Sequence, residues 1–157
     1  MSINLDGKKI VIFGGTGFIG KYLISQFSQF SCYIKIVSRN ITKVKTIKFL
    51  GNLGQVEIVK LNHFSEKNIN DIVYGSDIVI NLIGILYENK LQRFDIIHGE
   101  LPGIIARASK QQNVGKLIHI SALGVEKNTE SHYAKSKFLG EKNLKLEYPD
   151  AIIIRPS

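Results

Sequence analysis

The fold is decided by the stretch KKIVIFGGTGFIGKYL, residues 8–23. A short β-branched run, Lys8–Phe13, leads directly into glycines at positions 14, 17 and 20, and an amphipathic pattern from about Phe18 to Phe30 follows. The first part is typical of a buried strand and the last part of a helix. The spacing G-x-x-G-x-x-G is a weak signal by itself, but here it lies between a predicted strand and a predicted helix. The stretch therefore predicts a phosphate-binding turn.

Each glycine of this turn has a separate physical task. Gly14 permits the tight turn after the strand, Gly17 lets the backbone approach a pyrophosphate, and Gly20 lets the helix lie close to the sheet. The free N–H groups at the start of the helix, and the positive end of its dipole, then face the phosphates. The alternative is a strand-to-helix turn that is merely tight and binds nothing.

Strand and helix patterns alternate along the rest of the chain. The predicted strands cover Lys8–Phe13, Tyr33–Ser38, Val56–Leu61, Asp77–Leu82, Lys116–Ser121 and Ala151–Arg155. The predicted helices cover Phe18–Phe30, Asn40–Leu50, Ser65–Tyr74, Gln92–Gln112 and Ser131–Leu146. Pro102 is expected to kink or split the fourth helix near Leu101. The pattern predicts one α/β domain over residues 1–157, with a Rossmann-type doubly wound parallel sheet, right-handed crossovers and helices on both faces.

The end of the second predicted strand indicates the kind of dinucleotide. An NAD site usually has an acid here, about 20 residues after the glycine turn, which binds the ribose 2′-hydroxyl. The sequence at this place is Val37-Ser38-Arg39-Asn40, without an acid. Arg39 is suited to pair with a 2′-phosphate, and Lys43 lies one helical turn further on to assist. The pattern favours NADP(H) over NAD(H); the alternative is that Arg39 only begins a helix on the surface.

Two further strand ends are expected to meet the adenosine half. Asn62, after the third predicted strand, is placed to contact the adenine. Asn81-Leu82-Ile83-Gly84, at the end of the fourth, is expected to bring backbone close to the adenosine ribose, because carboxyl ends of parallel strands share one edge of the sheet. Asn81 has two interpretations of equal weight: a cofactor contact, or a strand residue that bonds neighbouring backbone.

Ser121, Tyr133 and Lys137 form a candidate catalytic set. Tyr133 and Lys137 are four residues apart on a predicted helix, so they share one face. A nearby ammonium would favour tyrosinate and lower the pKa of Tyr133, and the same lysine is suited to hold the nicotinamide-ribose hydroxyls. Ser121 ends the fifth strand, where its hydroxyl can bond a substrate carbonyl. The alternative is that Tyr133 only packs the helix on the sheet and Lys137 is solvated.

Composition limits the other classes of function. The chain has 21 Lys and Arg against 13 Asp and Glu, a formal net charge of +8. Basic and aromatic residues do not interleave as RNA-binding modules require, so we expect no nucleic-acid partner, and the charge reflects either solvated helix faces or a partner or membrane surface. The histidines are scattered and Cys32 is the single cysteine, so we expect no metal site and a buried Cys32. No apolar run approaches the roughly 18 residues of a membrane span.

Taken together, the glycine turn, Asn81-Leu82-Ile83-Gly84, Ser121 and Tyr133-x-x-x-Lys137 resemble the extended or atypical short-chain dehydrogenase/reductases. Longer segments narrow the resemblance. VIFGGTGFIG, GNLGQV, VINLIG, LPGIIARASKQQNVGKLIHISALG and YAKSKFLGEKNLKLEYPDAIIIRPS are similar to the NADPH-binding accessory subunits of respiratory complex I (NADH-ubiquinone oxidoreductase) and their bacterial relatives. The likeness runs from about Lys8 to Ser157, nearly the whole chain.

The resemblance implies a tightly held NADPH without settled turnover, on a protein at the periphery of a large electron-transfer complex. By position, it implies a pyrophosphate surrounded by Gly14, Thr16, Gly17, Phe18, Ile19 and Gly20. It also implies a 2′-phosphate at Arg39, beside Ser38 and Asn40, and a nicotinamide end lined by Ser121, Tyr133 and Lys137. Asn62 departs from the family, in which Asp is common at this position.

The resemblance also concerns what lies beyond the chain. Relatives continue past the RPS segment, residues 155–157, into a smaller C-terminal domain that closes the substrate site. We therefore expect this chain to be the N-terminal part of a longer architecture. Without that domain we do not expect a closed, water-excluding pocket, nor the catalysis that depends on one.

Three hypotheses of function follow. In the first, the chain holds NADP(H) as a largely structural cofactor among other subunits of a respiratory complex, in the cytoplasm or peripherally on the cytoplasmic face of the inner membrane (the matrix side in a mitochondrion). In the second, it is an active NAD(P)-dependent reductase or sugar-nucleotide epimerase that uses Ser121, Tyr133 and Lys137. In the third, it is a redox-sensing regulator that binds a dinucleotide and a protein. The fold alone does not choose between them.

Overall fold

The computed structural model describes residues 4–39, 47, 51–90, 92–127 and 130–157. All six strands run parallel in one sheet, in the order β3-β2-β1-β4-β5-β6. The strands are β1 (Lys9–Phe13), β2 (Tyr33–Ser38), β3 (Val56–Lys60), β4 (Ile78–Asn81), β5 (Lys116–Ile120) and β6 (Ile152–Ile154). The helices are α1 (Phe18–Phe27), α2 (Glu66–Val73), α3 (Leu101–Gln111) and α4 (His132–Glu147), with a π-helical segment η3 (Asp95–Glu100) before α3. This is the doubly wound order of a Rossmann sheet, so the predicted fold class is confirmed.

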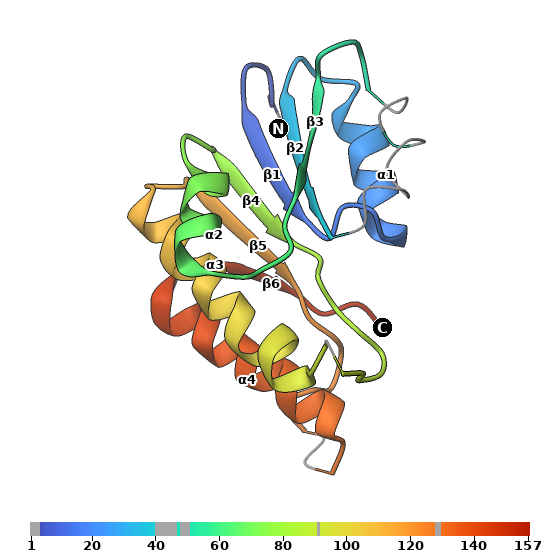
Figure 1. Cartoon of the computed structure of the whole chain (residues 1–157), viewed down its shortest axis with the longest axis vertical. Helices are drawn as coiled ribbons and strands as arrows, with labels where there is room; N and C mark the ends of the chain where they lie inside the picture. Colours follow the sequence, from blue (N-terminus) through green and yellow to red (C-terminus); the bar gives the residue numbers. More distant parts are fainter. Residues whose placement is uncertain (1–3, 40–46, 48–50, 91, 128–129) are drawn as a thin grey trace.

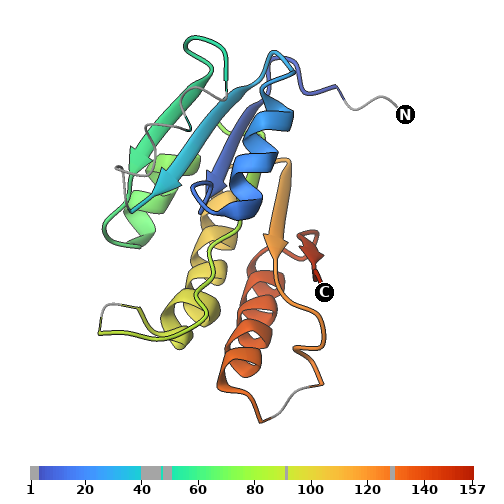
Figure 2. The same ribbon diagram turned by 90° about the vertical axis from the view of Figure 1, so that its right-hand side faces the viewer.

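The sheet separates two apolar cores. α2, α3 and α4 lie together on one face, and α1 lies on the other (Figures 1 and 2). Alternate residues of β1 supply the two sides: Val11 and Phe13 join the core under α2, α3 and α4, and Ile10 and Ile12 join the core under α1. Because both faces of the central strands are covered, those strands read as continuous apolar runs in the sequence.

The strand order determines where on the sheet a ligand-binding crevice can form. β1 lies between β2 and β4, with Phe13 beside Val37 on one side and Asn81 on the other. The chain winds toward β3 on one side of β1 and toward β6 on the other, so the helices after β1 and β4 leave on opposite faces. A crevice therefore opens at the carboxyl ends of β1 and β4, which is where doubly wound proteins bind ligands.

The predicted helix Gln92–Gln112 is divided in the structure. It begins as η3 and continues as α3 from Leu101, so the split expected near Leu101 is confirmed. The π-helical geometry was not predicted. Its physical cause is Pro102, which has no N–H to donate to the carbonyl of His98 four residues earlier. π-Helical turns of this kind are frequently found at functional sites.

Most other boundaries agree with the sequence to within a few residues. The predicted helix Ser65–Tyr74 is α2, for which Ser65 is the N-cap, and the Ser65 hydroxyl accepts a hydrogen bond from the backbone N–H of Asn68. α1 ends at Phe27 rather than Phe30.

The helix expected over residues 40–50 lies outside the described residues, except Ile47, which is buried. In the described part of the chain, no helix is long and apolar enough to cross a membrane.

Candidate functional site

The glycine turn has the geometry that its spacing predicts. Gly14 has φ 78°, and a β-carbon there would lie 3.0 Å from the backbone nitrogen of Ile83. A β-carbon at Gly20 would overlap the backbone of Gly15. Another residue at Gly14 would be strained by the positive φ and tight against Ile83, and at Gly20 no β-carbon fits, so Gly14 permits the turn and Gly20 permits α1 to lie against it.

Gly17 has a different part in the turn. It is the N-cap of α1 with ordinary φ −76°, and it supplies no side-chain cap. A β-carbon there would lie 3.4 Å from the carbonyl oxygen of Gly14, an ordinary contact. The chain itself therefore does not require glycine at this position, but a ligand that approaches the uncapped N–H groups of α1 would.

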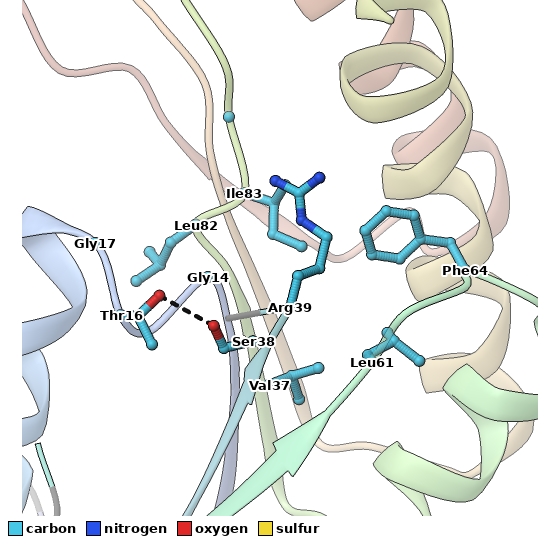
Figure 3. A pocket seen from close by; sticks show the side chains of 11 residues that line it. Gly14, Thr16, Gly17, Val37, Ser38, Arg39, Leu61, Phe64, Leu82 and Ile83 are labelled. Carbon is cyan, nitrogen blue, oxygen red and sulfur yellow. Dashed lines mark hydrogen bonds between the residues drawn. The ribbon is translucent and has the colours of Figure 1, made fainter. Parts of the chain in front are cut away.

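A cavity of about 260 Å³ lies beside this turn, at the carboxyl ends of the strands (Figure 3). It is lined by Gly14, Thr16, Gly17, Val37, Ser38, Arg39, Leu61, Phe64, Leu82, Ile83 and Gly84. The Oγ1 of Thr16 and the Oγ of Ser38 are 3.2 Å apart, which ties the glycine turn to the end of β2. In the close view the guanidinium of Arg39 extends between the side chains of Phe64 and Ile83. The cavity is thus lined by the N-terminus of α1 with its N–H donors, by the hydroxyls of Thr16 and Ser38, and by the Arg39 cation.

The structure brings together much of the predicted binding set. Gly14, Thr16, Gly17, Ser38, Arg39, Leu82, Ile83 and Gly84 all line the cavity. Phe18, Ile19 and Gly20 do not line it but form the first turn of α1 beside it. Asn62 lies in a separate hollow with Lys60 and His63, so it is not part of this cavity. Asn40 lies outside the described residues.

Three lining residues were not predicted: Val37, Leu61 and Phe64. Val37 is the second-last residue of β2, and Leu61 and Phe64 follow β3, so their positions near strand ends indicated the site. Their apolar character concealed it, because an apolar residue at a strand end reads as core. Phe64 offers an aromatic face beside Arg39, a surface on which an adenine or a guanidinium can stack.

Asn81 serves neighbouring groups within the protein. It is fully buried, and its Oδ1 accepts a hydrogen bond from the backbone N–H of Ile83 at 3.1 Å. Its Nδ2 donates to Nδ1 of His119 at 3.1 Å. Of the two interpretations from the sequence, the strand residue that bonds neighbouring backbone is the one confirmed. Asn81 shapes the chain that lines the cavity at Leu82 and Ile83.

Lys137 is a buried lysine, not a solvated one. Only 4% of its surface is exposed, and Nζ donates a hydrogen bond to the carbonyl of Ile120 at 2.9 Å. Burial lowers the pKa of Lys137 to about 8, although the Glu141 carboxylate acts in the opposite direction. Nζ also lies 3.9 Å from the place where a β-carbon of Gly84 would be, so the ammonium stands at the edge of the cavity.

Tyr133 differs from the expectation. Burial raises its pKa, which is the reverse of the lowering expected from a neighbouring ammonium. The Lys137 ammonium instead donates a hydrogen bond to the carbonyl of Ile120, at 2.9 Å. The ring of Tyr133 packs edge-on against His98, at 5.2 Å between ring centres, and against Phe94, at 5.8 Å.

Ser121 is enclosed in this structure. It is 4% exposed, and its Oγ makes no hydrogen bond of good geometry to any described residue. The hydroxyl nevertheless lies near the buried carboxylate of Glu141. Burial tends to raise the pKa of that carboxyl, but two hydrogen bonds from Arg155, with a smaller contribution from the Ser121 hydroxyl, hold it below its usual value. The side chain of Ser121 is therefore turned toward the core rather than open to a substrate.

Comparison with known proteins agrees with this architecture. A model of the NmrA-like family matches residues 6–144. The chain is 32% identical over 155 residues to the mitochondrial NADH dehydrogenase (ubiquinone) 1 alpha subcomplex subunit 9 of Mus musculus. That alignment covers 98% of this chain and 41% of the mouse protein, so the chain spans about two fifths of this relative. The resemblance found in the motifs is confirmed.

Solved structures show the same fold at lower identity. A putative NAD-dependent epimerase/dehydratase from Bacillus halodurans superposes with a TM-score of 0.80 at 19% identity, over 96% of this chain and 70% of that one. The Bordetella bronchiseptica enzyme WbmH, solved in complex with NAD⁺, superposes with a TM-score of 0.77 at 18% identity, over 95% of this chain and 56% of that one.

Proposed function

The chain belongs to the NmrA-like family, and on that premise we propose that it binds a nicotinamide dinucleotide across the carboxyl ends of β2, β1 and β4. One observation carries the proposal. A single cavity connects the uncapped N-terminus of α1 with Arg39 at one side and Gly84 at the other. Phosphates bind at the helix N-terminus, and the two nucleotide halves extend to either side of the strand-order reversal. The Bordetella enzyme with the same fold was solved with NAD⁺.

We propose that the dinucleotide is NADP(H) rather than NAD(H). β2 ends at Ser38, and the next residue is Arg39, where NAD-binding proteins usually have an acid for the ribose 2′-hydroxyl. Arg39 is exposed and borders the cavity, so its guanidinium is free to reach a 2′-phosphate. The hydroxyls of Thr16 and Ser38, which are 3.2 Å apart, line the same cavity and offer further donors.

We propose that the cofactor is largely structural. The mouse relative is by name a subunit of an NADH dehydrogenase, and 98% of this chain aligns with it. Two observations speak against turnover by this chain: the hydroxyl of Ser121 is enclosed, and burial raises the pKa of Tyr133. A bound dinucleotide would stabilise the folded state by mass action. The subunit would associate with other subunits of a respiratory complex at a membrane surface, on the cytoplasmic or matrix side.

We further propose that residues 1–157 are the dinucleotide-binding part of a longer architecture, since the matched relative is more than twice as long as the aligned region. One observation favours the alternative of an active NAD(P)-dependent reductase or epimerase. Lys137 is buried at the edge of the cavity with a pKa near 8, on the same helix as Tyr133. A second domain that reorients Ser121 would complete that set.

The test is to identify and titrate the nucleotide. The purified protein is denatured, the released nucleotide is identified by mass spectrometry, and NADPH and NADH are titrated against wild type, Arg39→Ala and Lys116→Ala. Lys116→Ala removes one exposed positive charge at the start of β5, at the opposite edge of the sheet from the cavity, and is the matched control.

We expect copurified NADP(H), and an NADPH affinity that falls at least about tenfold in Arg39→Ala but not in Lys116→Ala, as for loss of one charge-assisted pair. Equal and weak binding of NADH and NADPH would refute the cofactor assignment. Oxidation of bound NADPH with added carbonyl substrates would favour the enzyme.

A further inference from the structure

His98 is a buried histidine whose two ring nitrogens are both used. It is 2% exposed and lies in η3. Its Nε2 is 3.0 Å from the backbone nitrogen of Ile85, and its Nδ1 is 3.0 Å from the hydroxyl of Ser136. The Ser136 hydroxyl lies 2.7 Å from the carbonyl oxygen of Tyr133. Neither the glycine turn nor the candidate catalytic set includes His98, and the sequence did not single it out.

The directions of these hydrogen bonds define one tautomer. The backbone N–H of Ile85 can only donate, so Nε2 of His98 accepts and carries no proton. The proton is on Nδ1, which donates to Ser136, and the Ser136 hydroxyl donates to the Tyr133 carbonyl. Burial, together with the Lys137 charge, lowers the pKa of His98 to about 4, so the ring is neutral at pH 7 as this arrangement requires.

The backbone around His98 is also held. A β-carbon at Gly140 would overlap the carbonyl oxygen of His98, so α4 lies directly on this part of η3. Asn143, one turn further along α4, donates through Nδ2 to the carbonyl of Gly99 at 3.0 Å. Since both its main chain and its ring are fixed to α4, His98 holds the Ile85 segment in place relative to that helix.

The two ends of this connection lie at one end of the cavity. Ile85 follows Gly84, which lines the cavity, and Ser136 precedes Lys137. A β-carbon at Gly84 would lie 3.8 Å from Nε2 of His98 and 3.9 Å from Nζ of Lys137. The opposite end, with Thr16, Ser38 and Arg39, has no hydrogen bond to His98 among those of the described residues. Any effect of His98 should therefore be confined to the Gly84 end.

We propose that His98 is a positioning residue that sets the nicotinamide half of the dinucleotide site, by holding the Gly84–Ile85 segment at a defined distance from Tyr133 and Lys137. The inference rests on the proposed function. In a doubly wound sheet the dinucleotide extends from the second strand across the strand-order reversal, so with the adenosine half at Arg39 the nicotinamide half lies past Gly84.

The experiment compares two probes on the same variants. NADPH reports on the whole site, and 2′,5′-ADP, which lacks the nicotinamide half, reports on the Arg39 end alone. The variants are His98→Leu, which removes both ring hydrogen bonds at similar volume, His98→Gln, which keeps one acceptor and one donor, and Ser136→Ala. Arg39→Ala is the matched control at the other end. The fluorescence of bound NADPH gives a second readout, since it follows the surroundings of the nicotinamide.

In His98→Leu we expect NADPH affinity to fall about tenfold while 2′,5′-ADP affinity stays within about twofold, because the partly buried N–H of Ile85 loses its acceptor at the Gly84 end only. NADPH fluorescence should move toward that of the free cofactor, and His98→Gln should recover part of both effects. Arg39→Ala should weaken both probes. Ser136→Ala gives the same pattern more weakly, and it replaces His98→Leu if that variant does not fold.

Other outcomes separate the two proposals. Equal loss of both probes in His98→Leu, or no loss of either, would overturn the positioning role while the proposed function stands. Failure of wild type to bind NADPH and 2′,5′-ADP would refute the proposed function, and the role of His98 with it.

Discussion

The α-carbon of Gly140 lies against the carbonyl oxygen of His98, so closely that a β-carbon at residue 140 would overlap that oxygen. Pro102 explains why the contact is possible, because it has no N–H to compete for the same carbonyl. The side of η3 is thereby opened to α4, and the π-helical turn places the His98 ring between Ile85 and Ser136. Pro102 in α3 and Gly140 in α4 together allow η3 and α4 to pack closely at His98.

Gly140→Ala should destabilise the protein. The added methyl group has no room beside His98 and the ring of Pro102, so we expect the free energy of unfolding to fall by about 1–3 kcal/mol, as for overpacked cores. Urea unfolding at pH 7 measures it. Gly115→Ala is the control, because its β-carbon would meet only the carbonyl of Asp77 at 3.4 Å. Equal stability of the two variants would contradict the contact.

Stability should fall between pH 7 and pH 5. Burial lowers the pKa of His98 to about 4 and of His119 to about 3; the Lys137 charge adds to both, and Glu141 partly opposes it at His119. In the unfolded chain each histidine titrates near 6.5, so below that pH the unfolded state binds protons that the folded state does not. The free energy of unfolding should therefore drop by about 2 kcal/mol per histidine between pH 7 and pH 5.

Urea unfolding at both pH values tests this for wild type, His98→Gln and His119→Gln, with the exposed His63→Gln as control. Each buried variant should lose part of the pH dependence, and His63→Gln should keep it. A dependence unchanged in both buried variants would show that other groups cause it.

Glu141→Gln should cost more stability than Glu147→Gln. Glu141 is 4% exposed, and its carboxylate accepts two hydrogen bonds from Arg155, at 2.9 and 2.6 Å. Removing the charge leaves the guanidinium without its buried partner, at about 3 kcal/mol. Glu147 makes a more exposed pair with Arg107, for which we expect about 1 kcal/mol or less. Thermal unfolding of both variants measures the difference, and a reversed order would mean that the existing pair of Arg155 with Glu126, at 3.4 Å, compensates for the lost carboxylate.

The affinity for NADPH should depend on the charge of Lys137. Burial lowers the pKa of this lysine to about 8, so raising the pH from 7 to 9 converts most of it to the neutral amine. If Lys137 holds the nicotinamide ribose as an ammonium, NADPH affinity should fall by up to about tenfold over that range. The Lys137→Met variant should bind NADPH more weakly than wild type at pH 7, and its NADPH affinity should be nearly independent of pH. Fluorescence titration measures both, and a flat wild-type profile would place Lys137 outside the site.

Much of the fold and part of the site follow from local sequence. The strands are recognisable from the period of their apolar side chains, and the start of α2 from the hydroxyl of Ser65. The glycine turn is recognisable from its spacing, because Gly14 has a positive φ and Gly20 lies close to the backbone of Gly15. Each of these causes lies within a few residues of the feature. The carboxyl ends of parallel strands always share one edge. Residues such as Arg39, Ile83 and Gly84 could therefore be assigned to one site without coordinates.

What the sequence by itself determined is thus the doubly wound sheet and the tight glycine turn after β1, since both depend on short-range patterns. Only the tertiary structure decided which polar groups lie inside. It turned Lys137 toward the Ile120 carbonyl, enclosed Ser121, and placed His98 between Ile85 and Ser136. The positions of these side chains depend on how α4 packs on η3 and β5, which are contacts between residues far apart in the chain. Local sequence does not encode the direction of a side chain within such a contact.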